Sequence, residues 1–496
     1  MRSDEKPRSP LSADAITVAL GNWAAGQGPV YRQLADAIRN AVTAGDLLPE
    51  SRLPAERVLA RQLAVSRTTV LAAFDELKTT GWLRSRQGSG TWLTQPDPRG
   101  AAPPDADSAR SLRANAFLRP GLDAPIDLAT AALPATPIVT EIATRLDPAT
   151  VTELTSGHGY MPTGLELLHE RVAERFAADG VPTDPAELLI TTGTQQALAL
   201  IAALAVPSGG TALVETPTSP GILDALRSVG ADIRAVPVDN HGIRLDLLEE
   251  LMTRLSPRAV FVIPTFQTPT GAVMPTGQRR RLSALAERLQ ILVVEDLSHA
   301  PLELADSPPP PLCRFGVEHI VSVGSMSKLF WSGLRVGWIR ASRPLIARLT
   351  RLKATADLGS PLLSQLVAAQ LLTRFDEVRL QRRTALITRL DNLDALLAQH
   401  LPAWRWERPP GGLSAWIELP HGDSSAFVQL AQRHGVVVVP GPLLSADEGH
   451  HRHLRLSFAA GLGMLEEGIE RLARAWDAYV PSADRPLMVG APAALG

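Results

Sequence analysis

The first hundred residues carry hydrophobic positions with the spacing of short helices. Between Tyr31 and Thr43 the apolar residues recur every three or four positions, at Leu34, Ala37, Ile38 and Ala41, and this spacing predicts a first helix. A second helix is predicted from Leu53 to about Leu63, because Pro54 is favoured in a first turn. Ser66 can cap a third helix, whose inward positions are Val70, Ala73, Phe74 and Leu77.

Two short strands are predicted directly after the third helix. Residues 82–86 and 91–93 flank the run Gln87-Gly88-Ser89-Gly90, which puts glycines at the tip of a β-hairpin. Three helices followed by a hairpin predict a winged helix-turn-helix over residues 29–94.

The charges of this module point to nucleic acid. Its arginines include Arg52, Arg57, Arg67, Arg84 and Arg86. For any one of them a solvated surface position is the better explanation, but these five together in one short module favour contact with phosphates. Thr68 and Thr69 lie near the N-terminal end of the third helix, the end from which recognition helices commonly contact DNA.

The helical pattern stops between Gln95 and Pro125, a stretch rich in Pro, Ala, Asp and Arg. Such a composition cannot bury much surface and predicts a linker. Residues 29–94 should therefore fold separately from residues 126–480. We expect residues 1–28 and 481–496 to be flexible.

Three apolar runs after residue 125 predict buried strands, and each leads into residues that could bind a ligand or react with it. Residues 188–191 lead into Thr192-Gly193-Thr194, a glycine turn before a helix, which can present backbone N–H groups to a phosphate. Residues 291–294 lead into Glu295-Asp296, where a carboxylate could pair with a protonated pyridine nitrogen. Taken alone, each is more often an ordinary turn or a helix cap.

The third run, residues 319–323, leads into Gly324–Arg335, with the sequence GSMSKLFWSGLR. Lys328 follows a strand end, where sheet enzymes collect their ligands, and a desolvated lysine can form a Schiff base. Ser325 and Ser327 supply hydroxyl groups, and Arg335 can donate two hydrogen bonds to phosphate oxygens. Alone the segment could be a polar loop with a surface lysine, but with its upstream partners it indicates a pyridoxal phosphate site.

Composition limits the class of protein. With 496 residues, 45% of them hydrophobic and 20% charged, the chain can form two or three domains with a large core. The single cysteine, Cys313, excludes an internal disulfide framework and is typical of a reducing compartment. No apolar stretch approaches the roughly 20 residues of a membrane span, and no signal peptide is recognised. We expect a cytoplasmic protein without a metal site.

Residues from about 125 to 480 resemble the fold-type-I pyridoxal phosphate-dependent aminotransferases. The resemblance implies an α/β domain with a mixed, mostly parallel sheet and a smaller C-terminal α/β subdomain. It also implies a cofactor site. Gly193 and Thr194 would form its phosphate loop, and Asp296 would be the partner of the pyridine nitrogen. Lys328 would be the Schiff-base lysine, and Ser325 and Arg335 would clamp the phosphate.

Two further positions match through the same resemblance. Arg455 corresponds to the arginine that takes a substrate α-carboxylate, and Tyr160 to the tyrosine that reaches the phosphate of a neighbouring subunit, which implies a homodimer. The alternatives are a solvated or ion-paired arginine and a tyrosine that only packs. Three positions depart from the family pattern around the cofactor ring: Ser219, Ser298 and Thr268 replace the usual aromatic residue, tyrosine and asparagine.

Residues 29–94 resemble the GntR family of bacterial transcription factors, through RLPAERVLARQLAVSRTTVLAAFDELKTTGWL and the wing RQGSGT. The resemblance implies that operator DNA is contacted by Arg57, Ser66, Arg67, Thr68, Thr69 and Gly88. With the aminotransferase-like domain behind this module, the whole chain resembles the MocR subfamily.

The fusion favours a dimeric DNA-binding regulator whose second domain binds pyridoxal phosphate through Lys328 and senses a small amine, an amino acid or the vitamer itself. Two alternatives remain open at this level. One is an active aminotransferase with a DNA-binding head, and the other is a regulator that uses the second domain without a cofactor.

Overall fold

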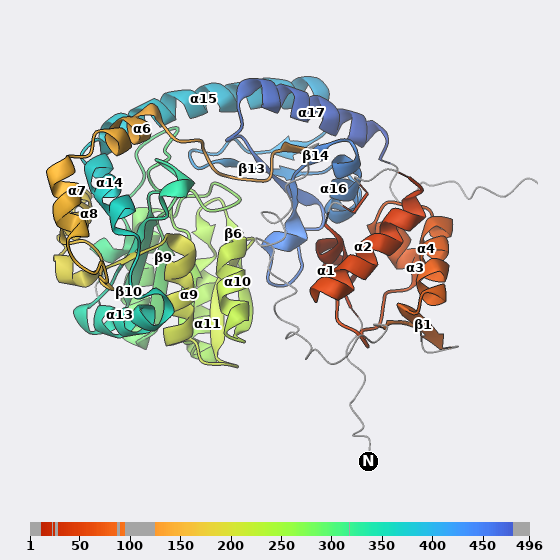
Figure 1. Ribbon diagram of the computed structural model, residues 1–496, viewed down its shortest axis with the longest axis horizontal. Helices are drawn as coiled ribbons and strands as arrows, with labels where there is room; N and C mark the ends of the chain where they lie inside the picture. Colours follow the sequence, from red (N-terminus) through yellow and green to blue (C-terminus); the bar gives the residue numbers. More distant parts are fainter. Residues whose placement is uncertain are drawn as a thin grey trace, which may run out of the picture.

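The computed structural model describes residues 11–21, 23–24, 28–86, 90–94, 125–316 and 318–479. The predicted linker over residues 95–124, the wing residue Gly88 and the tail over residues 481–496 lie outside this part of the chain. Figure 1 shows a small helical unit formed by the N-terminal residues, beside a larger α/β unit formed by the rest.

The N-terminal unit, called the head below, confirms the helices predicted from hydrophobic spacing. They are α2 (Val30–Ala44), α3 (Glu56–Gln62) and α4 (Arg67–Thr79). The predicted hairpin consists of β1 (Leu83–Arg86) and β2 (Gly90–Leu93), paired antiparallel with Leu83 opposite Leu93. Leu34, Ile38, Val70 and Phe74 are buried in its core.

One helix of the head falls in a segment that we expected to be flexible. Helix α1 (Ala13–Leu20) starts at Ser12, whose hydroxyl accepts a hydrogen bond from the Ala15 amide at 3.1 Å. Its apolar side, with Ile16 and Leu20 fully buried, belongs to the same core as α2, α3 and α4. The helix is therefore stabilised by packing within the head, which hydrophobic spacing over eight residues did not indicate.

The larger unit is built on an eight-stranded sheet with the order β4-β11-β10-β9-β8-β5-β6-β7. Strands β5, β6, β8, β9 and β10 run parallel to one another, whereas β11 is antiparallel to β10 and β4, and β7 is antiparallel to β6. This confirms the mixed, mostly parallel sheet. The strand bounds are β4 (Leu188–Thr191), β5 (Thr211–Thr216), β6 (Asp232–Asp239), β7 (Gly242–Ile243), β8 (Ala259–Val262), β9 (Leu292–Asp296), β10 (Ile320–Ser325) and β11 (Gly337–Arg340).

Both faces of this sheet are buried. Successive residues of β8 alternate between two hydrophobic clusters, with Val260 in one and Phe261 in the other. Such two-sided burial is the reason why the strands are continuous apolar runs. The covering helices include α8 (Glu166–Ala178), α9 (Thr194–Ala205), α10 (Pro220–Ser228), α11 (Leu245–Leu255), α12 (Thr276–Leu289), α13 (Arg343–Asp357) and α14 (Leu362–Leu372).

A smaller C-terminal subdomain follows the long helix α15 (Phe375–His400), as expected. Its antiparallel sheet has the order β12-β13-β16-β15, and Figure 1 shows α15 and α17 running side by side along one side of the molecule. The elements are β12 (Arg405–Trp406), β13 (Ser414–Glu418), α16 (Ser424–Arg433), β14 (Val436–Val437), β15 (Val439–Pro440), β16 (His453–Ser457) and α17 (Leu462–Asp477).

The head contacts this subdomain through α16. The Trp23 indole donates a hydrogen bond to Gln429 at 3.1 Å, and the Arg433 guanidinium donates to the carbonyls of Leu63 and Ala64 at 3.1 and 2.9 Å. Because helix C-termini leave carbonyls without an internal partner, Arg433 completes the end of α3. The helix that carries these contacts is part of the domain that holds the candidate site.

Among the described helices, none combines the length and the apolar character that a bilayer crossing requires.

Candidate functional site

The three apolar runs singled out in the sequence are strands that end close together at one edge of the large sheet. Asp296 in β9 is paired with Val323 in β10, two residues before Ser325. A β-carbon placed on Gly337 in β11 would lie 2.7 Å from the Gly193 α-carbon and 2.7 Å from the Gly324 carbonyl oxygen. The structure therefore brings the glycine turn, the acidic strand end and the lysine segment to one place.

The glycine turn after β4 has the geometry of an anion-binding site. Gly193 has a φ of 117°, which suits glycine, and α9 starts at the next residue. A β-carbon placed on Gly193 would lie 3.2 Å from the Arg335 guanidinium. The buried hydroxyl of Thr194 has no hydrogen-bond partner among the described residues. A helix N-terminus, a guanidinium and an available hydroxyl together suit a phosphate group.

Lys328 lies in the loop after β10 and is half-buried. Its ammonium donates a hydrogen bond to the Ala131 carbonyl at 2.6 Å. Ser325 and Ser327 are held together, with their hydroxyl oxygens 2.9 Å apart and the Ser327 amide donating to Ser325 at 3.0 Å. These bonds order the loop in which the lysine and both hydroxyl groups are presented.

Asp296 is buried at the end of β9 and accepts a hydrogen bond from the Ser298 amide at 2.8 Å. Nearby lies Glu215, a fully buried carboxyl group that sequence analysis did not single out. Burial raises the pKa of Glu215 to about 8, helped by the negative charge of Asp296 and opposed by hydrogen bonds from Gln267 and Ile263. Glu215 is thus largely neutral at pH 7. Its place in the sequence of β5 does not indicate this protonation state.

The three positions that depart from the aminotransferase pattern lie in the same region. Ser219 is the residue before α10, and its side chain makes no capping hydrogen bond. The Thr268 hydroxyl lies 3.3 Å from Nδ1 of His299, and both residues are buried. His299, next to Ser298, was missed by sequence analysis, and it brings a buried imidazole beside Thr268.

Arg455 comes from the smaller subdomain, in β16, and its guanidinium donates to the Ala129 carbonyl at 2.6 Å. Its carbonyl partner lies two residues from that of Lys328, so one segment binds both cationic side chains. Tyr160, the other residue predicted from the resemblance, has 62% of its surface exposed.

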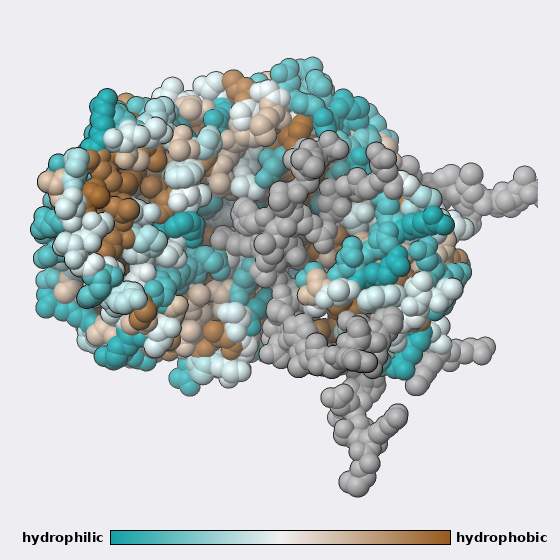
Figure 2. All heavy atoms as spheres, viewed as in Figure 1, coloured by the Kyte–Doolittle hydropathy of each residue, from teal (hydrophilic) through white to brown (hydrophobic). Residues whose placement is uncertain are grey.

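Tyr160 belongs to a group of exposed apolar residues. Met161, Leu358 and Leu363 are exposed by 40%, 50% and 49%. A β-carbon placed on Gly359 would lie 2.9 Å from the Met161 carbonyl oxygen, which brings the two segments together. Figure 2 shows apolar side chains gathered on one side of the larger unit. Exposed apolar surface of this kind is typical of protein interfaces.

In the head, four of the predicted DNA-contacting residues, Ser66, Arg67, Thr68 and Thr69, lie at the start of α4. Ser66 caps this helix by accepting a hydrogen bond from the Thr69 amide at 3.1 Å, and its hydroxyl lies 2.7 Å from that of Thr68. Ser66, Arg67 and Thr68 are exposed, and Arg67 forms an ion pair with Glu56 at 3.1 Å. Arg52 and Arg57 are exposed as well.

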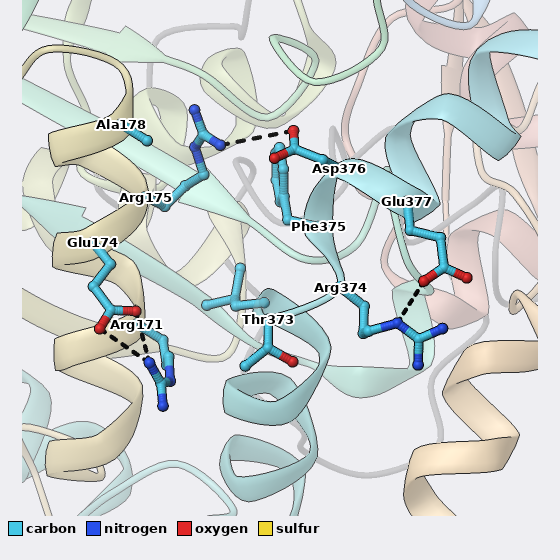
Figure 3. Close-up of a pocket in the computed structure, with 10 residues that line it drawn as sticks. Arg171, Glu174, Arg175, Ala178, Thr373, Arg374, Phe375, Asp376 and Glu377 are labelled. Atoms are coloured by element: carbon cyan, nitrogen blue, oxygen red, sulfur yellow. Dashed lines mark hydrogen bonds and ion pairs between the residues drawn. The ribbon is translucent and has the colours of Figure 1, made fainter.

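A separate cleft between α8 and the start of α15 is lined by charged side chains, but its charges neutralise one another. Arg171 pairs with Glu174 at 2.8 Å, Arg374 pairs with Glu377, and Arg175 approaches Asp376 at 4.0 Å. Figure 3 shows these pairs lining the cleft. Such paired surface charges offer little to a charged ligand, so we do not consider it the functional site.

Comparison with known proteins agrees with both units. Residues 127–475 match the family "Aminotransferase class I and II", and residues 30–93 match "Bacterial regulatory proteins, gntR family". The chain is 30% identical to the uncharacterized HTH-type transcriptional regulator YisV of Bacillus subtilis, covering 90% of this chain and 95% of that protein. It is also 30% identical to the probable rhizopine catabolism regulatory protein MocR of Rhizobium meliloti, over 76% of this chain and 78% of that protein.

Among solved structures, the α-aminoadipate aminotransferase LysN of Thermus thermophilus, complexed with N-(5'-phosphopyridoxyl)-L-leucine, superposes with a TM-score of 0.65 and 31% identity. The match covers 71% of this chain and 92% of that one.

Fold and site together define a DNA-binding regulator in which a winged helix-turn-helix is fused to an aminotransferase-like domain. Both units lie within the match to regulators, because the match to YisV covers 90% of this chain. The chain belongs to the MocR-type subfamily of GntR regulators.

Proposed function

We propose that this regulator acts in the cytoplasm, binds pyridoxal phosphate at the strand-end site through a covalent bond to Lys328, and senses a small amine, an amino acid or the vitamer itself. The observation that carries the proposal is the convergence of Gly193, Asp296 and the Lys328 loop at one sheet edge. The relative complexed with a phosphopyridoxyl amino acid supports the same class of ligand.

The residues present suit this cofactor. Gly193, Thr194, Ser325 and Arg335 would hold its phosphate, and Asp296 would face the pyridine nitrogen. When bound, pyridoxal phosphate supplies an aldehyde that captures amines and a ring that withdraws electrons. The buried, available hydroxyl of Thr194 is the structural feature that most favours a phosphate at this turn.

The proposed sensing step involves the segment from Ala129 to Ala131, which binds the side chains of Lys328 and Arg455. A ligand that engages Lys328 or Arg455 must compete with the carbonyls of Ala131 and Ala129. In the sequence, this segment directly follows residues 95–124, which connect it to the head. Such a ligand regulates only as far as it binds one arrangement of the two units better than the other.

Replacing the lysine tests the covalent step. Wild-type protein mixed with pyridoxal phosphate should develop a visible absorbance band that is retained after gel filtration, and Lys328→Ala should lose it. A band of unchanged position and intensity in the variant would show that the cofactor bonds elsewhere. Colourless wild-type protein at saturating cofactor would favour a regulator that works without it.

Catalytic transamination is the second candidate function, supported by Asp296 and by the placement of Arg455 near Lys328 through their shared segment. It is opposed by Ser219, Ser298 and Thr268 at positions that usually tune the ring. Sustained keto-acid release from a panel of amino acids, absent in Lys328→Ala, would establish the enzyme. A single half-turnover at most is expected from a sensor.

We further propose that the regulator is a homodimer and that its apolar group of Tyr160, Met161, Leu358 and Leu363 lies in the interface. Their exposure in the single chain supports burial by a partner of the same kind. Sedimentation analysis should give twice the chain mass for the wild type. Replacing both Met161 and Leu363 by aspartate should shift the protein toward the monomer.

A further inference from the structure

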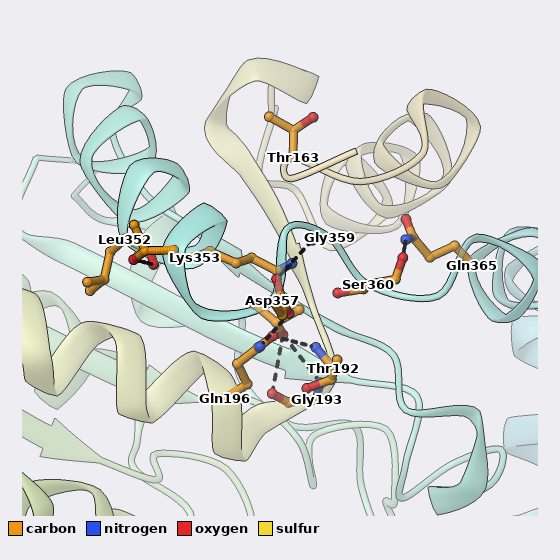
Figure 4. A network of polar contacts seen from close by, with 12 residues as sticks. Thr163, Thr192, Gly193, Gln196, Leu352, Lys353, Asp357, Gly359, Ser360 and Gln365 are labelled. Carbon is orange, nitrogen blue, oxygen red and sulfur yellow. Dashed lines mark hydrogen bonds and ion pairs between the residues drawn. The ribbon is translucent and has the colours of Figure 1, made fainter. Parts of the chain in front are cut away.

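A series of hydrogen-bonded polar side chains, which starts at the fully buried Lys353, connects α13 with the glycine turn of the candidate site. The Lys353 ammonium donates to one carboxylate oxygen of Asp357 at 2.8 Å, and the Gln196 amide donates to the other at 2.7 Å. The carbonyl oxygen of the Gln196 side chain then accepts from the Thr192 amide at 2.9 Å. Figure 4 shows these groups converging on Asp357.

The burial of Lys353 distinguishes the Lys353–Asp357 pair from a surface ion pair. Its side chain is completely buried, while that of Asp357 is 23% exposed. A buried ammonium without a carboxylate partner would be strongly destabilising, so Lys353 holds Asp357 in place. Burial acts to raise the pKa of Asp357, but the hydrogen bonds from Lys353 and Gln196 outweigh it and lower the pKa below its usual value. Asp357 therefore stays an anion and a strong acceptor.

The series of hydrogen bonds that starts at Lys353 ends at the backbone of the glycine turn. Thr192 precedes Gly193, and the hydrogen bond from its amide to Gln196 keeps the turn against the first residues of α9. Gly193 is also held from below by Thr191, whose hydroxyl donates to the Gly193 carbonyl at 3.2 Å. These contacts fix the direction of the N–H groups at the start of α9, on which anion binding at a helix N-terminus depends.

We infer that Asp357, anchored by Lys353 and acting through Gln196, is a positioning residue for the phosphate-binding turn at Thr192–Thr194. The inference rests on the proposed function, because it assigns the turn to the phosphate of the cofactor. None of the three side chains needs to touch the ligand. Their effect should be confined to the phosphate, since the aldehyde bonds at Lys328 on a different loop.

The test compares two aldehydes that differ only in the phosphate. Wild type, Gln196→Ala and the control Arg343→Ala are titrated with pyridoxal phosphate and with pyridoxal, following the absorbance band. Loss of one net hydrogen bond predicts that Gln196→Ala weakens pyridoxal phosphate binding by about three- to tenfold. Its pyridoxal affinity should stay at the wild-type value. Arg343 lies on α13, the helix of Lys353 and Asp357, in an exposed ion pair with Asp184. Its variant should match wild type for both ligands.

Asp357→Asn should have a larger effect in the same direction where it folds, but it leaves the Lys353 charge without its carboxylate. Gln196→Ala keeps that ion pair, so the inference does not depend on the harsher variant. Equal weakening of both ligands, or no weakening of either, would overturn the inference.

Wild-type protein that binds neither aldehyde would overturn the proposed function instead. The inference is then judged with inorganic phosphate in a thermal shift assay. Phosphate should raise the melting temperature of wild type and of Arg343→Ala but not of Gln196→Ala. An equal shift in all three proteins, or a shift in none, would overturn it.

Discussion

Glu215 combines full burial with one carboxylate oxygen that has no hydrogen-bond partner among the described residues. Its pKa rises to about 8 in the folded protein from an ordinary value of 4.5. Between these values the unfolded chain has lost the proton and the folded chain keeps it, so the free energy of unfolding falls as the pH rises. The slope contributed by this one group approaches about 1.4 kcal/mol per pH unit.

We expect Glu215→Gln to remove this contribution. The amide has the same shape and no charge, so its free energy of unfolding should depend less on pH between 5 and 8 than that of the wild type. Urea denaturation at several pH values measures both slopes. Parallel pH profiles for the two proteins would show that Glu215 is already ionised in the folded state.

Single residues of the site were predictable from sequence where the chemistry follows a strand directly. Gly193, Asp296 and Lys328 each stand within a few residues of an apolar run. Gln196 and Asp357 were not predictable as partners, because 161 residues separate them and neither has an unusual neighbourhood in the sequence. Glu215 was missed for a related reason: only the fold brings Gln267 and Asp296 beside it.

Helix α4 is the element through which we expect the head to contact DNA, and Ser66 caps its N-terminal end. Ser66 accepts the amide hydrogen bond that its first turn would otherwise lack. We expect Ser66→Ala to lower the free energy of unfolding of the head by about 1 kcal/mol. Thermal denaturation followed by circular dichroism measures this loss, and Ser66→Asp should restore most of it because aspartate is also a good cap.

Arg67 at the start of the same helix tests contact with DNA. Removing one phosphate contact should weaken binding to any duplex and reduce the slope of log affinity against log salt by about one. Arg67→Ala should show both effects in a fluorescence anisotropy titration. Lys78→Ala is the matched control, since Lys78 lies in the last turn of α4, in an ion pair with Asp75. Equal salt slopes for Arg67→Ala and wild type would remove Arg67 from the DNA interface.

At the scale of elements, hydrophobic spacing predicted α2, α4 and the hairpin because each carries enough apolar residues to define a face. Helix α1 was not predicted because its eight residues are nearly all apolar or small. Which side of α1 is buried is decided by its packing against α2 and α3. Short helices depend on such tertiary contacts for stability.

At the scale of the whole molecule, the contact between head and subdomain could not be predicted. Trp23 and Gln429 are separated by 406 residues, and Arg433 binds carbonyls that any residue could offer. Ala64, whose carbonyl accepts a hydrogen bond from Arg433, lies two residues before Ser66, the cap of α4. The subdomain that carries Arg455 is therefore in direct contact with the turn that positions α4.

This arrangement predicts that Arg433 transmits ligand binding to DNA binding. Coupling between two sites is a free energy that is equal in both directions, and values of about 1–3 kcal/mol are usual. With a duplex selected for binding in vitro, a ligand that engages the cofactor site should change wild-type DNA affinity by about fivefold or more. In Arg433→Ala the same ligand should bind with wild-type affinity while its effect on DNA affinity falls toward none. Arg474→Ala, on the exposed side of α17, should keep the wild-type ratio. If Arg433→Ala also kept that ratio, Arg433 would not carry the coupling, and the Trp23–Gln429 contact and the segment at Ala129 and Ala131 would be the routes left to test.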